Sequence, residues 1–490
     1  MPSARTKGHR LHMNAESSLR PVPPARRPYL TDADRDLIRL AQEPGFRRWL
    51  EQIKATGGCA RPVYLAGHTA TIDAATGAVL HHYDTANEPG GRLPIRCRNR
   101  RESVCPSCSR LHAGDTFHLV RAGLHGGKGT PATVAQHPRL FVTLTAPSFG
   151  AVHRVTRDGA RCRPRRNDSA CEHGRPLGCG LIHTEEDPAA GQPLCTRCYD
   201  YTGHVLWHAH AGSLWNRTTG SIRRHVATEA GITQSRLRDH ARLSFAKVAE
   251  FQRRGAVHFH AVIRLDGPTG PESSPQGWAT VDLLTNAVQA AASSVFVPMP
   301  YVRVLGESSF RWGVQVDCHP IHASAVNPGT SDQAVAAYIA KYVSKSVGDA
   351  GGTDRPVTSG EEIEMLPASA HIRLLMATCW RLGWLPELAQ LRLHAWTHTL
   401  GFRGHALTKS RCYSTTYAAL REERAGYRRE GEELTATDGR TVLSEADWRY
   451  VGSGYTPGAA LIAAGIADDL AMSRQIAREE PRVDRHGEGR

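Results

Sequence analysis

The sequence predicts an α+β fold in which an antiparallel sheet is covered by helices. Two apolar segments, 243–251 and 257–264, are separated only by a short Arg-Arg-Gly turn, as expected for a hairpin. A strand is expected at 140–146. Further strands are expected at 301–305 and at 310–318, where apolar and polar residues alternate. A helix is expected over 281–294, between the hairpin and these later strands, so strands and helices are interleaved along the chain.

Composition favours a nucleic-acid partner and argues against a membrane protein. The chain has 490 residues, enough for two or three domains, with a net charge of +14 and a sequence pI near 9.4. It has no run of 18 apolar residues and no hydrophobic N-terminal signal segment. We therefore expect a cytoplasmic protein whose partner is a nucleic acid and not a membrane.

The hairpin carries a candidate site for a divalent metal ion. His258 and His260 are two residues apart, so in a strand both point to one face, and the turn can bring Glu250 beside His258. Two imidazoles and a carboxylate suit a transition-type cation with open coordination positions. His208 and His210 form the same His-x-His pattern, but no hairpin or carboxylate accompanies them, and we expect them to be structural.

A short helix over 337–345 presents two tyrosines and two lysines on one face. Tyr338, Lys341, Tyr342 and Lys345 have helical i, i+3, i+4 and i+7 spacing, and Ser331 or Asp332 is a plausible N-cap. Alone, this pattern describes an amphipathic surface helix. Near a metal ion, the same pattern is typical of a tyrosine nucleophile, because a phenol with a pKa near ~10 needs a cation or a base to help it attack a phosphate.

Both segments match motifs of one superfamily. His258-Phe259-His260, and later Tyr338-x-x-Lys341-Tyr342, resemble the motifs of HUH endonucleases of the rolling-circle replication initiator type, and 141–148 resembles their threonine-rich early strand. The segments CRNRRESVCPSC at 97–108 and LGFRGHALTKSRCYSTT at 400–416 are similar to replication initiators of actinomycete plasmids and integrative conjugative elements.

The resemblance implies a fold and a reaction. It implies a ferredoxin-like antiparallel sheet with helices on one face, and Mg²⁺ or Mn²⁺ held by His258, His260 and Glu250. Tyr342 would attack first and Tyr338 second, with the lysines at 341 and 345 stabilising charge. The products would be a tyrosine-5′-phosphate adduct and a free 3′ hydroxyl.

The implied substrate is a replication origin, as single-stranded DNA or an extruded hairpin. Arg253 and Arg254 are expected to contact its backbone. The Gly-Gly-Lys-Gly run at 126–129 lacks the spacing of a nucleotide-binding phosphate loop, so a host helicase would be required beside a host polymerase. Alternatives are an HUH transposase or relaxase with the same residues, and a non-enzymatic, zinc-containing DNA-binding regulator.

Cysteines predict structural zinc sites, because a chain without a secretion signal seldom uses disulfides. The first predicted site consists of Cys59, Cys97, Cys105 and Cys108, and the second of Cys162, Cys171, Cys195 and Cys198. His173, Cys179 and His183 compete for positions in the second site.

The predicted domain order has five parts. A disordered basic arm at 1–28 precedes a zinc module at 29–137, which begins with a helix capped by Thr31 and running to about residue 53. An HUH nickase domain at 138–350 contains a cysteine-rich insertion at about 155–212, followed by a helix over 213–237. A helical C-terminal region at 361–475, with helices at 367–382 and 385–396, precedes a disordered tail at 476–490.

Overall fold

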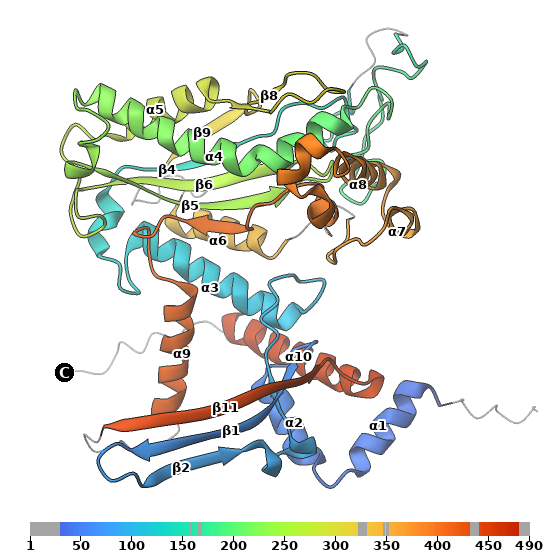
Figure 1. Ribbon diagram of the computed structural model, residues 1–490, viewed down its shortest axis with the longest axis vertical. Helices are drawn as coiled ribbons and strands as arrows, with labels where there is room; N and C mark the ends of the chain where they lie inside the picture. The colour runs from blue at the N-terminus through green and yellow to red at the C-terminus, as the bar shows by residue number, and fades with distance from the viewer. Residues whose placement is uncertain are drawn as a thin grey trace, which may run out of the picture.

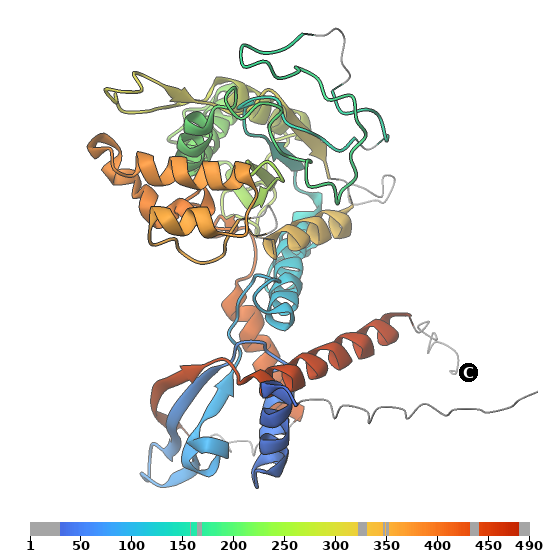
Figure 2. The same cartoon turned by 90° about the vertical axis from the view of Figure 1, so that its right-hand side faces the viewer.

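The computed structural model describes residues 30–156, 158–163, 169–321, 331–345, 348, 352–431 and 441–479. The predicted arm at 1–28 and the tail beyond 479 lie outside these residues. The molecule has two lobes, with α3 (Pro106–His125) and α9 (Tyr417–Gly431) between them (Figure 1; Figure 2 shows the same arrangement from the side). No helix in the described ranges has the length and apolar character needed to cross a bilayer.

The upper lobe is built on a five-stranded sheet in which every neighbouring pair is antiparallel. Its spatial order is β10 (Leu407–Lys409), β5 (Arg242–Phe251), β6 (Val257–Asp266), β4 (Arg139–Leu144) and β9 (Val316–Pro320). Along the chain, β4-α4-β5-β6-α5-β9 forms a βαββαβ series, with β6 between β5 and β4. This is the split βαβ arrangement. Strand β10 comes from the 400–416 segment and extends the sheet beside β5.

Helices cover both faces of this sheet, which corrects the prediction of helices on one face. Helices α4 (Tyr201–Glu229) and α5 (Val281–Ser294) pack on the face that includes Phe259 and Ile263. Helices α6 (Asp332–Val343) and α3 pack on the opposite face, where Val248 and Val262 meet Ile339 (Figure 1). The physical reason is that the second face of the hairpin also carries apolar side chains, Ala246, Val248 and Val262, and these are buried against α3 and α6.

The predicted strands after α5 are partly wrong. Residues 301–305 form a turn closed by an isolated bridge between Val302 and Gly306. The predicted strand 310–318 is broken into β8 (Ser309–Phe310), which pairs with β7 (Val297–Pro298), and β9. Between them the Trp312 indole donates to Thr218 on α4, and this contact takes the chain out of the sheet.

Most of the predicted helices are present, but several begin or end at other residues than predicted. Thr31 caps α1 (Asp32–Gln42) in a capping box, but a Pro-Gly pair ends that helix before α2 (Phe46–Ala55). The helix predicted over 213–237 is α4, which begins earlier, at Tyr201, and ends earlier, at Glu229. In the C-terminal half, α7 (Gly360–Met365) and α8 (Ala370–Leu382) are followed by 3₁₀ turns where a helix at 385–396 was predicted. The 3₁₀ segments are Thr85–Asn87, Pro89–Gly91, Ala132–Gln136, Leu237–Asp239, Pro386–Leu391 and Leu393–Thr399.

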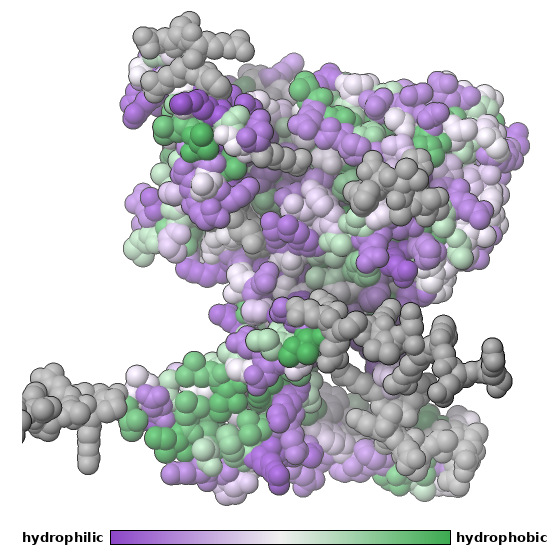
Figure 3. All heavy atoms as spheres, turned by 180° about the vertical axis from the view of Figure 1, so that it is seen from behind, coloured by the Kyte–Doolittle hydropathy of each residue, from purple (hydrophilic) through white to green (hydrophobic). Residues whose placement is uncertain are grey.

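The lower lobe combines the two ends of the described chain. Strand β1 (Val63–Asp73) pairs with β2 (Val79–Asp84), β3 (Leu93–Ile95) and β11 (Val442–Ser453). Helix α10 (Pro457–Glu479) packs beside α1 and α2. The expected helical region at 361–475 is therefore divided, because 442–453 is a strand of the N-terminal module. Apolar side chains gather on this lobe in Figure 3, and α10 exposes Leu461, Met472 and Ile476.

Candidate active site and metal clusters

The predicted metal ligands share one face of the central hairpin. Glu250 lies directly opposite His258 in the β5–β6 ladder, and His260 is two residues further along β6. His260 Nε2 lies 2.7 Å from a Glu250 carboxylate oxygen, and its Nδ1 lies 3.0 Å from the hydroxyl of Thr143 on β4. Thr143 therefore orients the ring. It belongs to the motif strand noted in the sequence, where its own role could not be recognised.

His258 has a buried ring nitrogen, Nε2, with no hydrogen-bond partner within the described chain. Burial lowers the pKa of His258 to about 3, and the nearby Arg254 and His260 add to this effect. The imidazole is therefore neutral and keeps a lone pair that a cation can accept. The described side chains do not bring the donor atoms of His258, His260 and Glu250 all within 4.8 Å of one another.

The two tyrosines of α6 lie over His260. The Tyr338 hydroxyl is 3.5 Å from His260 Nε2, and the Tyr342 ring stacks on the imidazole with centroids 5.6 Å apart. The two phenol rings are themselves 4.6 Å apart. The ammonium groups of Lys345 and Lys341 lie 5.0 and 5.8 Å from the centre of the Tyr342 ring. The two tyrosines thus meet at one imidazole, and the two lysines lie beside the ring of Tyr342.

Helix α6 is fixed at both ends and along its inner face. Ile339 and Val343 are buried against the sheet, and the Ser331 hydroxyl caps the first turn. At the other end, the Arg100 guanidinium donates to the carbonyls of Val343 and Lys345 at 2.9 and 2.7 Å. Arg100 belongs to the cysteine-rich segment at 97–108, so that segment contacts the tyrosine helix directly.

His208 and His210 are core residues, as expected. His208 Nδ1 donates to the carbonyl of Leu400, and its Nε2 accepts the backbone N–H of Val257, directly before His258. His210 bonds to the Leu206 carbonyl of its own helix. His208 therefore positions the start of β6, and both of its ring nitrogens take part in hydrogen bonds.

The first predicted cysteine set is brought together. The thiols of Cys59, Cys97, Cys105 and Cys108 offer sulfur atoms that all lie within 4.8 Å of one another. Backbone N–H groups of Ala60 and Cys97 donate to the sulfurs of Cys105 and Cys59, each at 3.3 Å. Four gathered thiols with backbone donors are the set that a structural zinc ion requires.

The second predicted set is wrong as a single site, because its members fall into two clusters. Cys171, Cys195 and Cys198 gather with His173, whereas Cys162 gathers with His153, Cys179 and His183. Three of the predicted competitors are thus members, and His153 was missed because it lies before the expected insertion. The reason is local folding: residues 162–163 pair with 179–180 by backbone hydrogen bonds, which carries Cys162 away from Cys171.

Comparison with known proteins finds a family that matches most of the chain. Residues 45–468 match the RepSA family, described as replication initiator protein, pSAM2. The chain is 46% identical over 462 residues to a replication initiator protein of Streptomyces ambofaciens, covering 93% of this chain and 97% of that protein. No solved structure matches the chain.

Proposed function

The chain belongs to the RepSA family of plasmid replication initiator proteins, and we propose that it starts replication by nicking one origin strand through a tyrosine-phosphate intermediate. The proposal includes an HUH-type nuclease fold for the upper lobe. The βαββαβ order and the pairing of the histidine strand with its carboxylate strand support it.

One observation carries the proposal, namely the contact of two phenols with an imidazole–carboxylate pair. Tyr338 and Tyr342 from α6 meet His260, which in turn holds Glu250. A helix that merely packs on the sheet would not need both tyrosines over a polar histidine. Nucleophile, imidazole and carboxylate at one place are the parts that covalent phosphoryl transfer uses.

The residue types at this site suit a divalent ion, because His258 is a neutral imidazole with an orphaned nitrogen and its ladder partner Glu250 offers a carboxylate; the donor atoms of His258, His260 and Glu250 would have to move closer together to share one ion. His258, His260 and Glu250 would hold Mg²⁺ or Mn²⁺. When bound, such an ion supplies Lewis-acid polarisation of the scissile phosphate.

The chain's own residues carry out the transfer. The Tyr342 oxygen forms a bond to the scissile phosphorus, the bond from phosphorus to the 3′ oxygen breaks, and the tyrosine becomes joined to the 5′ phosphate. The phenolic proton passes to solvent, to which Tyr342 is partly exposed, and the leaving 3′ oxygen takes up a proton. Lys341 and Lys345 favour the phenolate and the charged phosphate by Coulomb attraction. The free 3′ hydroxyl then primes synthesis by a host polymerase, with a host helicase unwinding the template.

Two observations support a different role for each tyrosine. The ammonium groups lie around Tyr342, which supports it as the first nucleophile. The Tyr338 hydroxyl is held against His260 and is available for a second transfer at termination. Both hydroxyls can reach one phosphate, because the residues are one helical turn apart.

The test is cleavage of labelled single-stranded oligonucleotides that tile the plasmid origin, with Mn²⁺ present. We expect a cleaved product and an adduct that survives denaturing electrophoresis. Replacing both tyrosines by phenylalanine should abolish both products.

The matched control is Tyr427→Phe, which removes a hydroxyl from an exposed tyrosine on α9. Sequence-specific binding without cleavage of any origin oligonucleotide would contradict the nicking proposal. It would favour a DNA-binding initiator that recruits a host nuclease.

A further inference from the structure

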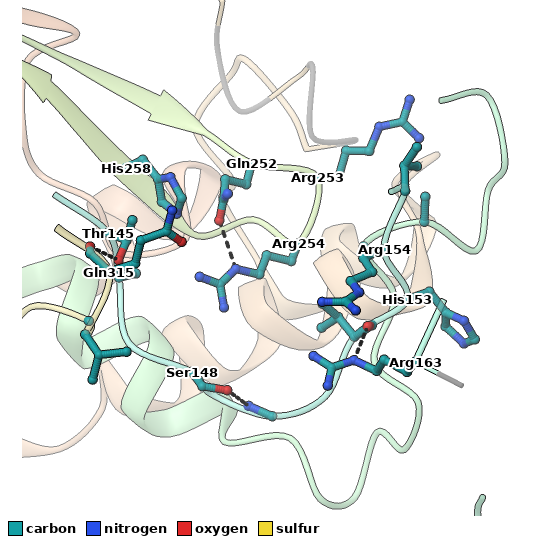
Figure 4. A pocket seen from close by; sticks show the side chains of 18 of the residues that line it. Thr145, Ser148, His153, Arg154, Arg163, Gln252, Arg253, Arg254, His258 and Gln315 are labelled. Carbon is teal, nitrogen blue, oxygen red and sulfur yellow. Dashed lines mark hydrogen bonds between the residues drawn. The ribbon is translucent and has the colours of Figure 1, made fainter. Parts of the chain in front are cut away.

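A pocket of about 430 Å³ opens beside the candidate active site. It is lined by His258, by the hairpin turn at 252–254, by the segment that follows β4 at 145–148, and by the cysteine-rich insertion, which contributes residues from 150–155 and Arg163 (Figure 4). The volume lies in the range of small-ligand pockets, roughly 300–1,000 Å³. It suits a single nucleotide and excludes a duplex.

Three arginines point into this space from two different segments. Arg254 comes from the hairpin turn, and Arg154 and Arg163 come from the insertion (Figure 4). Within the described part of the chain none of the three forms an ion pair with a carboxylate. Arg253 also lines the pocket, but it differs from the other three because it pairs with Glu185, another lining residue, at 3.4 Å.

The insertion arginines directly follow members of the newly found cluster. Arg154 follows His153, and Arg163 follows Cys162, so the positions of two cluster residues fix where the two arginines start. The Arg154 backbone N–H donates to the Cys162 sulfur at 3.3 Å, and the Arg163 guanidinium donates to the Val152 carbonyl at 2.9 Å. The pocket wall and the Cys₂His₂ cluster are therefore one unit.

This cluster has the surroundings of a real metal site. His183 Nε2 lies 3.1 Å from His153 Nδ1 and 3.3 Å from the Cys179 sulfur, and the Cys162 side chain is fully buried. His183 uses its other nitrogen, Nδ1, to bond Asp187 at 2.5 Å. A carboxylate that orients a ligating histidine in this way is usual around zinc. Two thiols and two imidazoles in one group suit tetrahedral Zn²⁺.

The insertion is also docked tightly onto the hairpin turn. Gly191 has a φ of +87°, and a Cβ there would lie 2.8 Å from the backbone of Arg253. The Glu185–Arg253 ion pair lies at the same contact. The arginines on the insertion are thus held at a fixed distance from His258 on the next strand.

We propose that the cluster of His153, Cys162, Cys179 and His183 binds zinc, and that it thereby holds Arg154 and Arg163 to bind a phosphate of single-stranded DNA next to the scissile bond. The three guanidinium groups, which have no carboxylate partner among the described residues, attract a phosphodiester. Because His258 lines the same pocket, a phosphodiester bound there would lie beside the proposed nicking site. This inference rests on the proposed nicking function, because only that function makes the neighbouring phosphate scissile. Its test measures binding and does not depend on cleavage.

The test measures binding of a fluorescent single-stranded origin oligonucleotide by anisotropy, without divalent metal, over a series of salt concentrations. The double variant Arg154→Ala/Arg163→Ala should bind at least about 10-fold more weakly. Its plot of log affinity against log salt should be shallower by about 0.7, the value for one lost phosphate contact on single-stranded DNA. Cys179→Ser should lose one zinc ion per chain and show the same weakening.

The control variant is Arg161→Ala/Arg175→Ala, which removes the same charge from exposed positions of the same insertion outside the pocket. Its affinity should stay within about 2-fold of the wild type. Unchanged binding in the 154/163 variant, or equal weakening in the control, would overturn the proposal. If no oligonucleotide is cleaved but the binding difference appears, the nicking proposal fails and the pocket stands. If the wild type cleaves the oligonucleotide but the 154/163 variant binds it as tightly as the wild type does, the pocket proposal fails and the nicking proposal stands.

Discussion

Replacing His208 with asparagine is expected to destabilise the upper lobe at neutral pH and to make its stability less dependent on pH. The His208 ring lies in the core between α4 and β6, where it bonds the Leu400 carbonyl and the Val257 N–H. Asparagine can keep the bond to Leu400 but is too short to reach Val257. The orphaned backbone N–H should cost about 1–3 kcal/mol.

The change in pH dependence follows from burial. Burial lowers the pKa of His208 from 6.5 to about 4 in the folded protein, so between these values the unfolded chain binds more protons. The stability that neutral His208 contributes is complete above about pH 6.5 and is lost as the pH falls toward 4. Between about pH 7 and pH 5, the loss for this one group is about 2 kcal/mol.

The assay is urea unfolding followed by tryptophan fluorescence at several pH values for wild type, His208→Asn and His405→Asn. His405 is exposed in the same lobe and serves as the control. Comparing variants at each pH cancels the pH dependence of the cysteine clusters. The stability difference between wild type and His208→Asn should shrink by about 2 kcal/mol from pH 7 to pH 5. A difference that stays constant with pH would refute the assignment of a buried, neutral His208.

Three further predictions concern the metal sites and the nucleophile. His258→Ala should reduce nicking at least about 100-fold and leave duplex origin binding within about 2-fold in a gel-shift assay, whereas Glu250→Gln should recover part of its activity in excess Mn²⁺. Metal analysis of the purified chain should find about three zinc ions, and both Cys105→Ser and Cys179→Ser should lose one, with only the former unfolding the lower lobe on heating. Peptide mapping of the covalent adduct should find the DNA on Tyr342 in the wild type; an undiminished adduct in Tyr342→Phe would contradict the proposed order of attack.

Local patterns in the sequence predicted the elements that carry the candidate site. The hairpin of 243–264 and the helix capped by Ser331 are present, and the residues expected on each face lie there. These predictions succeeded because strand alternation, helix spacing and capping depend on residues a few positions apart.

Long-range pairing could not be predicted in the same way. Strand β11 pairs with β1, almost 380 positions away, and its alternation resembles that of many exposed segments. The two clusters of the insertion posed the same difficulty. Cys162 and Cys171 are equally plausible partners for the Cys-x-x-Cys pair at 195–198 by spacing, and only the folding of 162–163 against 179–180 separates them. Arg154 carried no signal, because its role depends on that same folding.

The contact between the first cysteine cluster and α6 links metal binding in the lower half of the molecule to the tyrosines. Cys97 and Cys105 flank the loop that carries Arg100, and α3, which begins directly after Cys105, packs along α6. If zinc holds this loop, it also holds the guanidinium that satisfies the C-terminal carbonyls of the tyrosine helix. Loss of that zinc ion would free the end of α6 nearest Tyr342 and Lys345 while leaving His258 and His260 in their strand. The structure therefore connects the cysteine-rich segment at 97–108 to the tyrosine helix through the Arg100 hydrogen bonds and the packing of α3 on α6.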